Sequence, residues 1–364
     1  MIDEPAEQAR QAPYVELLDA LIAAWDALTV FPPGPEPGDE RGRPAAWTRK
    51  EPLPQRACLL FNRWAGNPLA RQLEDEFPGW ARDRFTVPDR YFEDREEHAP
   101  VVLELPEEFV LPQPERARRL RPLRRWLVRC LMHADRQRHD RLGVQDFCGV
   151  VVSPANAQTL TRHWVGLGEQ RPPHGEESVL FRYQDPRVMQ RVWTTLSPVQ
   201  QARWLGPVTQ WWALRQPWGP YGAQDEPAQW FQATTPVLPH GTTCGGPASD
   251  LFTGEQWFLA GVSPDANAIW SGYARNGIAP QAQPDPSSMV RMLADAARME
   301  LQAVNLEDYV WATWRHNPTQ GAPHRVDWAL PHLAPTLNAI TARLRIEPDT
   351  RVATLFAQAI RSKD

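Results

Sequence analysis

The 364-residue sequence lacks the short motifs that mark common enzyme active sites. It has no G-x-S-x-G elbow, no Walker A loop, no G-x-G-x-x-G after a strand, no H-E-x-x-H helix and no zinc-deaminase signature. Its nine histidines are dispersed along the chain rather than grouped with other ligands. We therefore expect a protein without enzyme activity, and we expect no cofactor and no bound metal.

Cysteines and long apolar runs are also scarce. The four cysteines, Cys58, Cys130, Cys148 and Cys244, are widely separated and form no C-x-x-C pair, which favours buried free thiols over a zinc site. No run of 18 apolar residues exists, and the acidic first five residues do not resemble a signal peptide. These absences predict a cytoplasmic protein that does not enter a membrane.

Proline and tryptophan, by contrast, are abundant. The chain has 38 Pro, roughly twice the usual share of about 5%, and 17 Trp. Many loops should therefore be stiff. The large apolar surface of the Trp side chains must be buried in this protein or against a partner.

Short apolar runs followed by helix-start signals predict an α/β lobe. The expected strands are residues 58–61, 101–105, 147–152 and 179–183. Asn67, Ser153, Asp185 and Ser197 each precede a proline, the arrangement of an N-cap followed by the first helical residue. Strands that lead into capped helices favour a mixed sheet with helices packed on it.

The rest of the chain is predicted to be helix and loop. An apolar face from Tyr14 to Leu28 predicts an N-terminal helix, and Pro122 is expected to start a helix that carries Trp126 and Cys130. After about residue 250 the pattern predicts a smaller all-helical lobe. The expected C-terminal helices are residues 253–261, 287–304, 306–315, 330–344 and 349–361.

Composition divides the chain into five parts. They are an appended helix (1–31), a flexible Pro/Gly-rich linker (32–55), an α/β domain (56–212), a Pro/Gly/Trp-rich loop (213–250) and a helical lobe (251–364). A loop as long as the fourth part is usually functional or joins two domains.

Two charge features allow other interpretations. Ten Arg between Arg116 and Arg141 face only Asp135 and Asp140, a pattern that could bind nucleic acid. Because the whole chain has a net charge of −5, a solvated helix face or a site for an acidic protein is the better interpretation. His98, beside two glutamates, is expected to lie in a solvated acidic loop.

One segment is more specific: Phe181-Arg182-Tyr183-Gln184-Asp185-Pro186-Arg187-Val188. On physical grounds Asp185 should cap a helix that Pro186 begins, with Arg182 and Arg187 close enough to pair with its carboxylate. The segment resembles the F-R-[FY]-x-D-P-R-V motif of the type VI secretion effector chaperones, also called Tap or Tec adaptors. Weaker collinear similarities extend the resemblance over about residues 57–212, although Cys148 stands where this family usually has Trp.

The resemblance implies an adaptor that binds a toxic effector in the cytoplasm and loads it onto the VgrG spike. From the net charge and the lack of long apolar runs, we expect neither nucleic acid nor a membrane as partner. We expect Phe181 to Arg187 to be structural. The candidate partner-binding residues are Trp211, Trp212, Trp218, Tyr221, Trp230 and Phe231. Two alternatives stay open: an enzyme of unrecognised type, such as an effector domain using Asp185 with His163 or His174, and a nucleic-acid-binding regulator.

Overall fold

The computed structural model describes residues 4–29, 55–106, 114–173, 175, 177–222, 226–238, 250–299, 301 and 303–315. The chain divides into two compact units. The first consists of Met1–Gln216 and Pro227–Trp257, and the second of Pro217–Glu226 and Phe258–Asp364. The expected linker 32–55, except its last residue, and the expected helices 330–344 and 349–361 lie outside the described residues.

The first unit is built on a six-stranded sheet of order β2-β3-β1-β4-β7-β8. Its strands are β1 (Arg56–Phe61), β2 (Phe85–Thr86), β3 (Val101–Glu104), β4 (Phe147–Ser153), β7 (Gln210–Leu214) and β8 (Trp230–Thr234). The α/β character is confirmed. All five pairings in this sheet are antiparallel, however, so it is not the mixed sheet that the sequence suggested.

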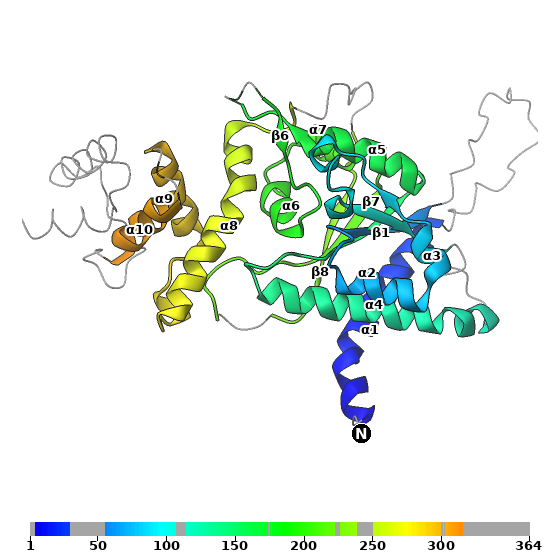
Figure 1. The fold of residues 1–364 in the computed structure, drawn as a ribbon. Coiled ribbons are helices and arrows are strands. Elements are labelled where there is room, and N and C mark those ends of the chain that lie inside the picture. The colour runs from blue at the N-terminus through cyan, green and yellow to red at the C-terminus, as the bar shows by residue number, and fades with distance from the viewer. Residues whose placement is uncertain are drawn as a thin grey trace, which may run out of the picture. The chain divides into compact units, whose positions relative to one another are not determined.

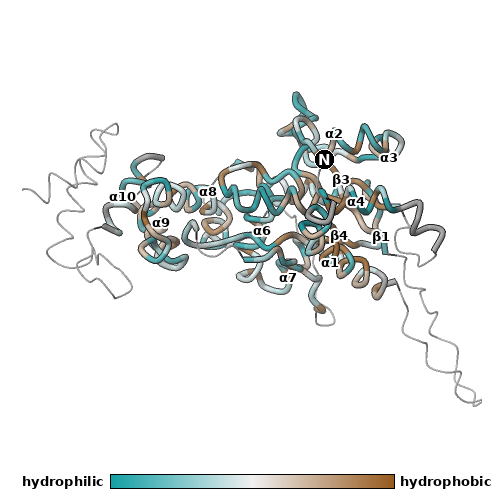
Figure 2. Tube along the Cα trace, turned by 90° about the horizontal axis from the view of Figure 1, so that it is seen from below, coloured by the Kyte–Doolittle hydropathy of each residue, from teal (hydrophilic) through white to brown (hydrophobic). Residues whose placement is uncertain are grey.

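Helices cover both faces of this sheet (Figure 1). One face carries α1 (Glu4–Thr29), α2 (Pro68–Glu76) and α4 (Pro114–His139), and α5 (Ala157–Gly168) and α7 (Pro198–Leu205) lie on the other. The remaining helices of this unit are α3 (Pro78–Arg82), α6 (Pro186–Trp193) and the 3-10 turns η1 (Arg90–Phe92) and η2 (Glu96–His98). Apolar residues concentrate along β1, β4 and α1, as Figure 2 shows.

The N-terminal helix is part of the core rather than an appendage. Leu18, Leu21 and Trp25 of α1 are buried in one cluster with Leu59 of β1 and Trp126 of α4. Pro122 does not start α4 as expected, because the helix begins eight residues earlier and contains this proline.

The segment expected to be a loop, residues 213–250, is partly sheet. β7 and β8 pair in continuous register along one edge of the sheet. The prolines and glycines between the two strands obscured this hairpin in the sequence, because they lie in the long connection rather than in the strands.

The expected strand at 179–183 is likewise shorter and lies elsewhere. β6 (Val179–Leu180) pairs only with β5 (Glu169–Gln170) in a separate two-stranded sheet. The residues after Leu180 form a turn that leads directly into α6.

The second unit is helical in its described part. It contains most of α8 (Gly254–Arg275), which is longer than the expected helix 253–261, with η5 (Pro280–Ala282), α9 (Pro286–Arg298) and α10 (Ala303–Arg315). Its core is a cluster around Trp270, Tyr273 and Leu293. No described helix of either unit is both long enough and apolar enough to cross a membrane.

Candidate functional site

The corner where the chain enters α6 is held by Asp185. Its side chain accepts a hydrogen bond from the backbone N–H of Arg187 at 2.9 Å, and Pro186 occupies the first turn of the helix. An N-cap carboxylate satisfies a donor that the helix itself leaves unpaired. The cap expected from the sequence is therefore present, and Asp185 is buried.

Arg187 connects this corner to the turn after α4. Its Nε and Nη2 atoms donate to the two carboxylate oxygens of Asp185 at 2.9 and 2.7 Å. Its Nη1 donates to the carbonyls of Arg141 and Gly143, both at 2.9 Å. Burial alone would lower the pKa of Arg187, but hydrogen bonding and attraction to Asp185 outweigh it and raise this pKa. The guanidinium thus stays charged and fixes two chain segments together.

The two aromatic residues of the segment anchor it in the interior. The Phe181 ring lies 4.8 Å from that of Phe252 and 5.4 Å from that of Trp204, measured between centroids. The Tyr183 ring stacks on Trp164 at 5.8 Å, and burial raises the pKa of its phenol well above the usual value. Both side chains are thus packed in the interior of the first unit.

The remaining members of the segment differ from each other. Gln184 is buried and donates from Nε2 to Oδ1 of Asn62 at 2.7 Å, which ties the corner to the end of β1. Arg182 is exposed. Among the described contacts, the carboxylate of Asp185 pairs with Arg187 and not with Arg182, so the pairing expected for Arg182 is absent.

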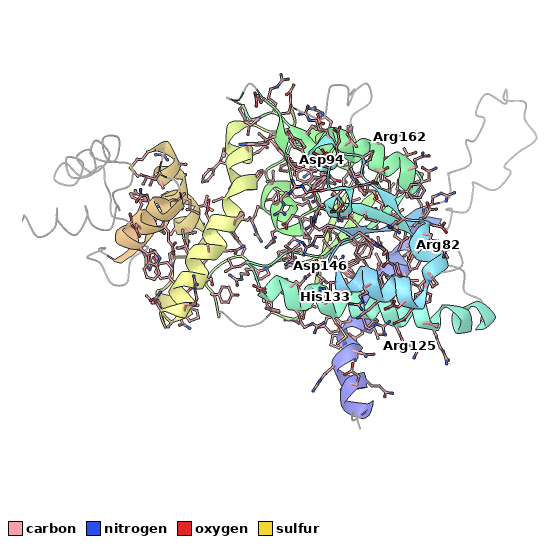
Figure 3. The ribbon with its side chains drawn as sticks, viewed as in Figure 1. Arg82, Asp94, Arg125, His133, Asp146 and Arg162 are labelled. Carbon is pink, nitrogen blue, oxygen red and sulfur yellow. The ribbon has the colours of Figure 1, made fainter. Side chains whose placement is uncertain are left out.

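A second polar cluster, which the sequence did not indicate, lies next to this corner. Asp146 Oδ2 contacts His133 Nε2 at 2.9 Å and accepts from Gln137 Nε2 at 2.7 Å, as Figure 3 shows for His133 and Asp146. The backbone carbonyl of Asp146 accepts the N–H of Asn62 at 3.1 Å. His133 and Gln137 are four residues apart on α4, a spacing that could have identified their common face. The cluster fastens α4 to the start of β4.

Two of the six candidate partner-binding residues are in the core. Trp211 is 0% exposed and Trp212 is 8% exposed, on opposite faces of β7. The Trp211 ring lies 6.1 Å from that of Trp164. Because Trp211 is enclosed by its own protein, it cannot directly contact a partner, which corrects the expectation drawn from its place beside an irregular segment.

Trp218 and Tyr221 belong to the second unit. The Trp218 ring packs edge-on against Trp270 at 4.9 Å. The backbone N–H of Tyr221 donates to Gln283 Oε1 at 2.9 Å. These contacts hold the segment 217–222 against the helices of its own unit.

Trp230 and Phe231 are the half-buried members of the set on β8. The Trp230 indole N–H donates to the carbonyl of Leu17 in α1 at 2.8 Å, and its ring meets Trp212 edge-on at 6.0 Å. Both residues therefore combine a supported position with some exposed apolar surface, on the outermost strand of the sheet.

Two histidines singled out in the sequence, His163 and His98, make contacts within this protein. His163 Nε2 lies 3.0 Å from the carbonyl of Trp204, and burial lowers the pKa of this histidine. His98 is beside Glu97 at the surface. Within the described residues, no group of three or more His, Cys, Asp or Glu could hold a metal ion. His174 and Cys244 lie outside the described residues.

The described cysteines are free and buried, as the sequence indicated. Burial raises the thiol pKa of Cys58, Cys130 and Cys148, so these groups stay protonated at neutral pH.

Several arginines of the basic run in α4 contact this protein's own acidic residues. Arg124 pairs with Asp19 of α1, and Arg129 pairs with Glu76 of α2 at 2.5 Å. These arginines therefore help to fasten the neighbouring helices to α4, although each pair is half-exposed and contributes little to stability.

Residues 87–203 match the model of a family described as a domain of unknown function, DUF4123. The matched range runs from just after β2 into α7, so it includes the Asp185 corner and the Asp146 cluster but neither α1 nor β8. No curated protein and no solved structure matches the chain.

Proposed function

We propose that this chain is a cytoplasmic adaptor that binds a cognate type VI secretion effector and loads it onto the VgrG spike. The observation that carries the proposal is the match of residues 87–203 to the DUF4123 family, which is associated with type VI effector adaptors. The Phe181 to Arg187 segment, which resembles the motif of such adaptors, lies inside this range.

The structure of the segment supports a scaffold role for it. Asp185 and Arg187 satisfy each other and three backbone groups, and Phe181 and Tyr183 are buried. A corner fixed in this way keeps the surrounding surface in one conformation before a partner binds. Such preorganisation lowers the entropy lost on association.

One form of the enzyme alternative, an effector domain, would use Asp185 with His163 or His174, of which His174 lies outside the described residues. Asp185 is committed to Arg187, and His163 faces the carbonyl of Trp204. These contacts leave neither group directed at a substrate, so we propose that the chain has no catalytic step of its own.

Co-purification tests the adaptor proposal. The tagged chain, expressed with the toxin encoded beside its gene and with the linked VgrG protein, should retain both, whereas an unrelated type VI effector should be lost on washing. Deleting the gene should stop delivery of that one effector and leave secretion of the spike intact. Retention of neither protein would contradict the proposal.

A toxicity assay separates the adaptor from the enzyme. Expressed alone in a bacterium, the chain should leave growth unchanged. Growth arrest that disappears in a folded His163→Gln variant would instead support an effector enzyme.

A further inference from the structure

Strand β8 pairs with β7 along one side, and no strand in the described part of the chain pairs with its other side. It forms an edge of the six-stranded sheet, with β7 as its neighbour. The N–H of Arg215 donates to the carbonyl of Gln229 at 2.7 Å, and the N–H of Thr235 donates to that of Thr209 at 3.0 Å. Hydrogen-bonded pairs alternate with non-bonded pairs along an antiparallel ladder. These two bonds therefore fix which residues of β8 direct their backbone towards β7.

By this alternation, the N–H and C=O groups of Phe231 and Ala233 point to β7. Those of Trp230, Gln232 and Thr234 point outward. No described residue makes a hydrogen bond to these outward backbone groups. The edge thus offers three donors and three acceptors spaced as in a β-strand.

Among the described residues, strand β8 itself has no feature that protects the edge against strand addition. Residues 230–235 contain no charged residue and no proline, and the pairing with β7 has no bulge. Natural proteins commonly shield an edge with charge, proline, a bulge or a very short strand. The opposite edge of this sheet follows that rule, since β2 has only two residues. Of the two edges of this sheet, β8 is therefore the one whose own residues lack such protection.

The side chains around the edge are uncharged and partly apolar. Trp230 is fixed to α1 through Leu17, Phe231 is half-buried, and Gln232 is exposed. Just beyond the strand, Val237 is 98% exposed, the most exposed of the large apolar side chains described. Single exposed apolar side chains are common on protein surfaces, so the outward backbone groups, rather than Val237, distinguish this edge.

We propose that β8 binds an extended segment of the effector, which adds to the sheet as a seventh, antiparallel or parallel strand. This inference rests on the proposed adaptor function. Main-chain hydrogen bonds to Trp230, Gln232 and Thr234 would provide affinity, as in other cases of strand addition. The added strand should carry uncharged residues, with apolar or β-branched side chains on the face that it shares with Phe231.

A second copy of this chain fits the edge less well. Five paired residues span about 17 Å, and the width added by one strand is about 5 Å, so the paired edge itself is on the order of 100 Å². A stable dimer needs about 800 Å² from each partner. An effector can obtain the remaining area elsewhere on the adaptor, whereas symmetric pairing at β8 supplies no such surface by itself.

A proline substitution at one position of β8 tests the backbone contact. Gln232→Pro removes an outward N–H and leaves the bonds to β7, and proline is tolerated at that kind of edge position. Gln232→Ala is the matched control, because it removes the exposed side chain and keeps the N–H. We expect Gln232→Pro to weaken binding of the effector encoded beside this gene by about tenfold or more, and Gln232→Ala to change it less than about twofold.

Hydrogen exchange on the unsubstituted protein gives a second measurement that does not depend on a variant folding. In the free chain the amides of Trp230, Gln232 and Thr234 should exchange fast, and in the effector complex they should become protected. If the effector binds while these amides still exchange fast, the inference is wrong and the adaptor function stands. Protection in the free chain that increases with its concentration, together with a dimer in sedimentation, would show that a second copy occupies the edge. If the unsubstituted chain binds no effector, the proposed function fails and this inference with it.

Discussion

The carboxylate of Asp185 and the guanidinium of Arg187 form a two-point ion pair, with N···O distances of 2.9 and 2.7 Å. The pair is largely buried, with side-chain exposures of 9% for Asp185 and 15% for Arg187. Asp185 and Arg187, both at the start of α6, thereby fix this helix to the turn after α4. Because the same arginine also binds two backbone carbonyls, loss of either partner leaves several buried groups unsatisfied.

Asp185→Ala should therefore lower the free energy of unfolding by about 2–4 kcal/mol, from the lost cap and the unpaired charge of Arg187. Chemical denaturation at pH 7 measures this. Asp94→Ala is the control, since Asp94 is exposed and should change stability by less than about 0.5 kcal/mol. A D185A variant that unfolds like the parent yet no longer binds effector would show that this corner is a contact surface.

Gly149→Ala should be strongly destabilising. Gly149 lies in β4 with φ of +129°, and a Cβ atom there would lie 2.2 Å from the backbone carbonyl oxygen of Trp212. Either the two strands separate or the backbone changes conformation, at a cost of about 2–4 kcal/mol.

Gly261→Ala is the matched control for this substitution. Gly261 is exposed within α8, and a methyl group added there would have no atom within 4 Å, so alanine should stabilise the helix by about 0.5–1 kcal/mol. Thermal unfolding of the two variants should move in opposite directions. Equal midpoints would refute the close approach of β4 and β7.

The packing of α1 into the core predicts a contrast between two leucines on one helix. Leu21 is 3% exposed and Leu28 is 39% exposed. Leu21→Ala should cost about 2–4 kcal/mol, because it leaves a cavity under the helix, whereas Leu28→Ala should cost less than about 0.5 kcal/mol. Urea denaturation measures both. Equal, small effects would mean that α1 is an appendage, as its sequence context had suggested.

Acid should destabilise the protein in part through His163. Burial lowers the pKa of His163 below its usual 6.5. Below pH 6.5, His163 therefore binds a proton more readily in the unfolded chain than in the folded chain. The contribution of His163 to stability is thus complete above pH 6.5 and is lost as pH falls, by up to about 1.4 kcal/mol per pH unit.

The comparison of variants isolates this effect. His163→Gln should make the fall in unfolding free energy between pH 7 and pH 5 smaller than in the parent. Identical slopes in the parent and the His163 variant would mean that His163 titrates as in water.

Features that depend on neighbours in the chain could be predicted from the sequence. The strands at 58–61, 101–105 and 147–152, the cap at Asp185 and the apolar face of the first helix all follow from local pattern, and each is present. The resemblance of the segment Phe181 to Val188 likewise depends on consecutive residues, and the family match includes it. Local preferences suffice where one segment contains both the signal and its physical cause.

Features that depend on distant residues were decided only by the tertiary structure. The sequence could not show that Trp211 is buried against Trp164, because burial of a side chain depends on which element packs over it. Nor could it show that Arg187 donates to the carbonyls of Arg141 and Gly143, or that β8 forms an edge of the sheet. Both arrangements bring together segments that lie more than ten residues apart in the chain. Pairing and packing free energies arise between segments, and the chain order alone does not say which segments become neighbours.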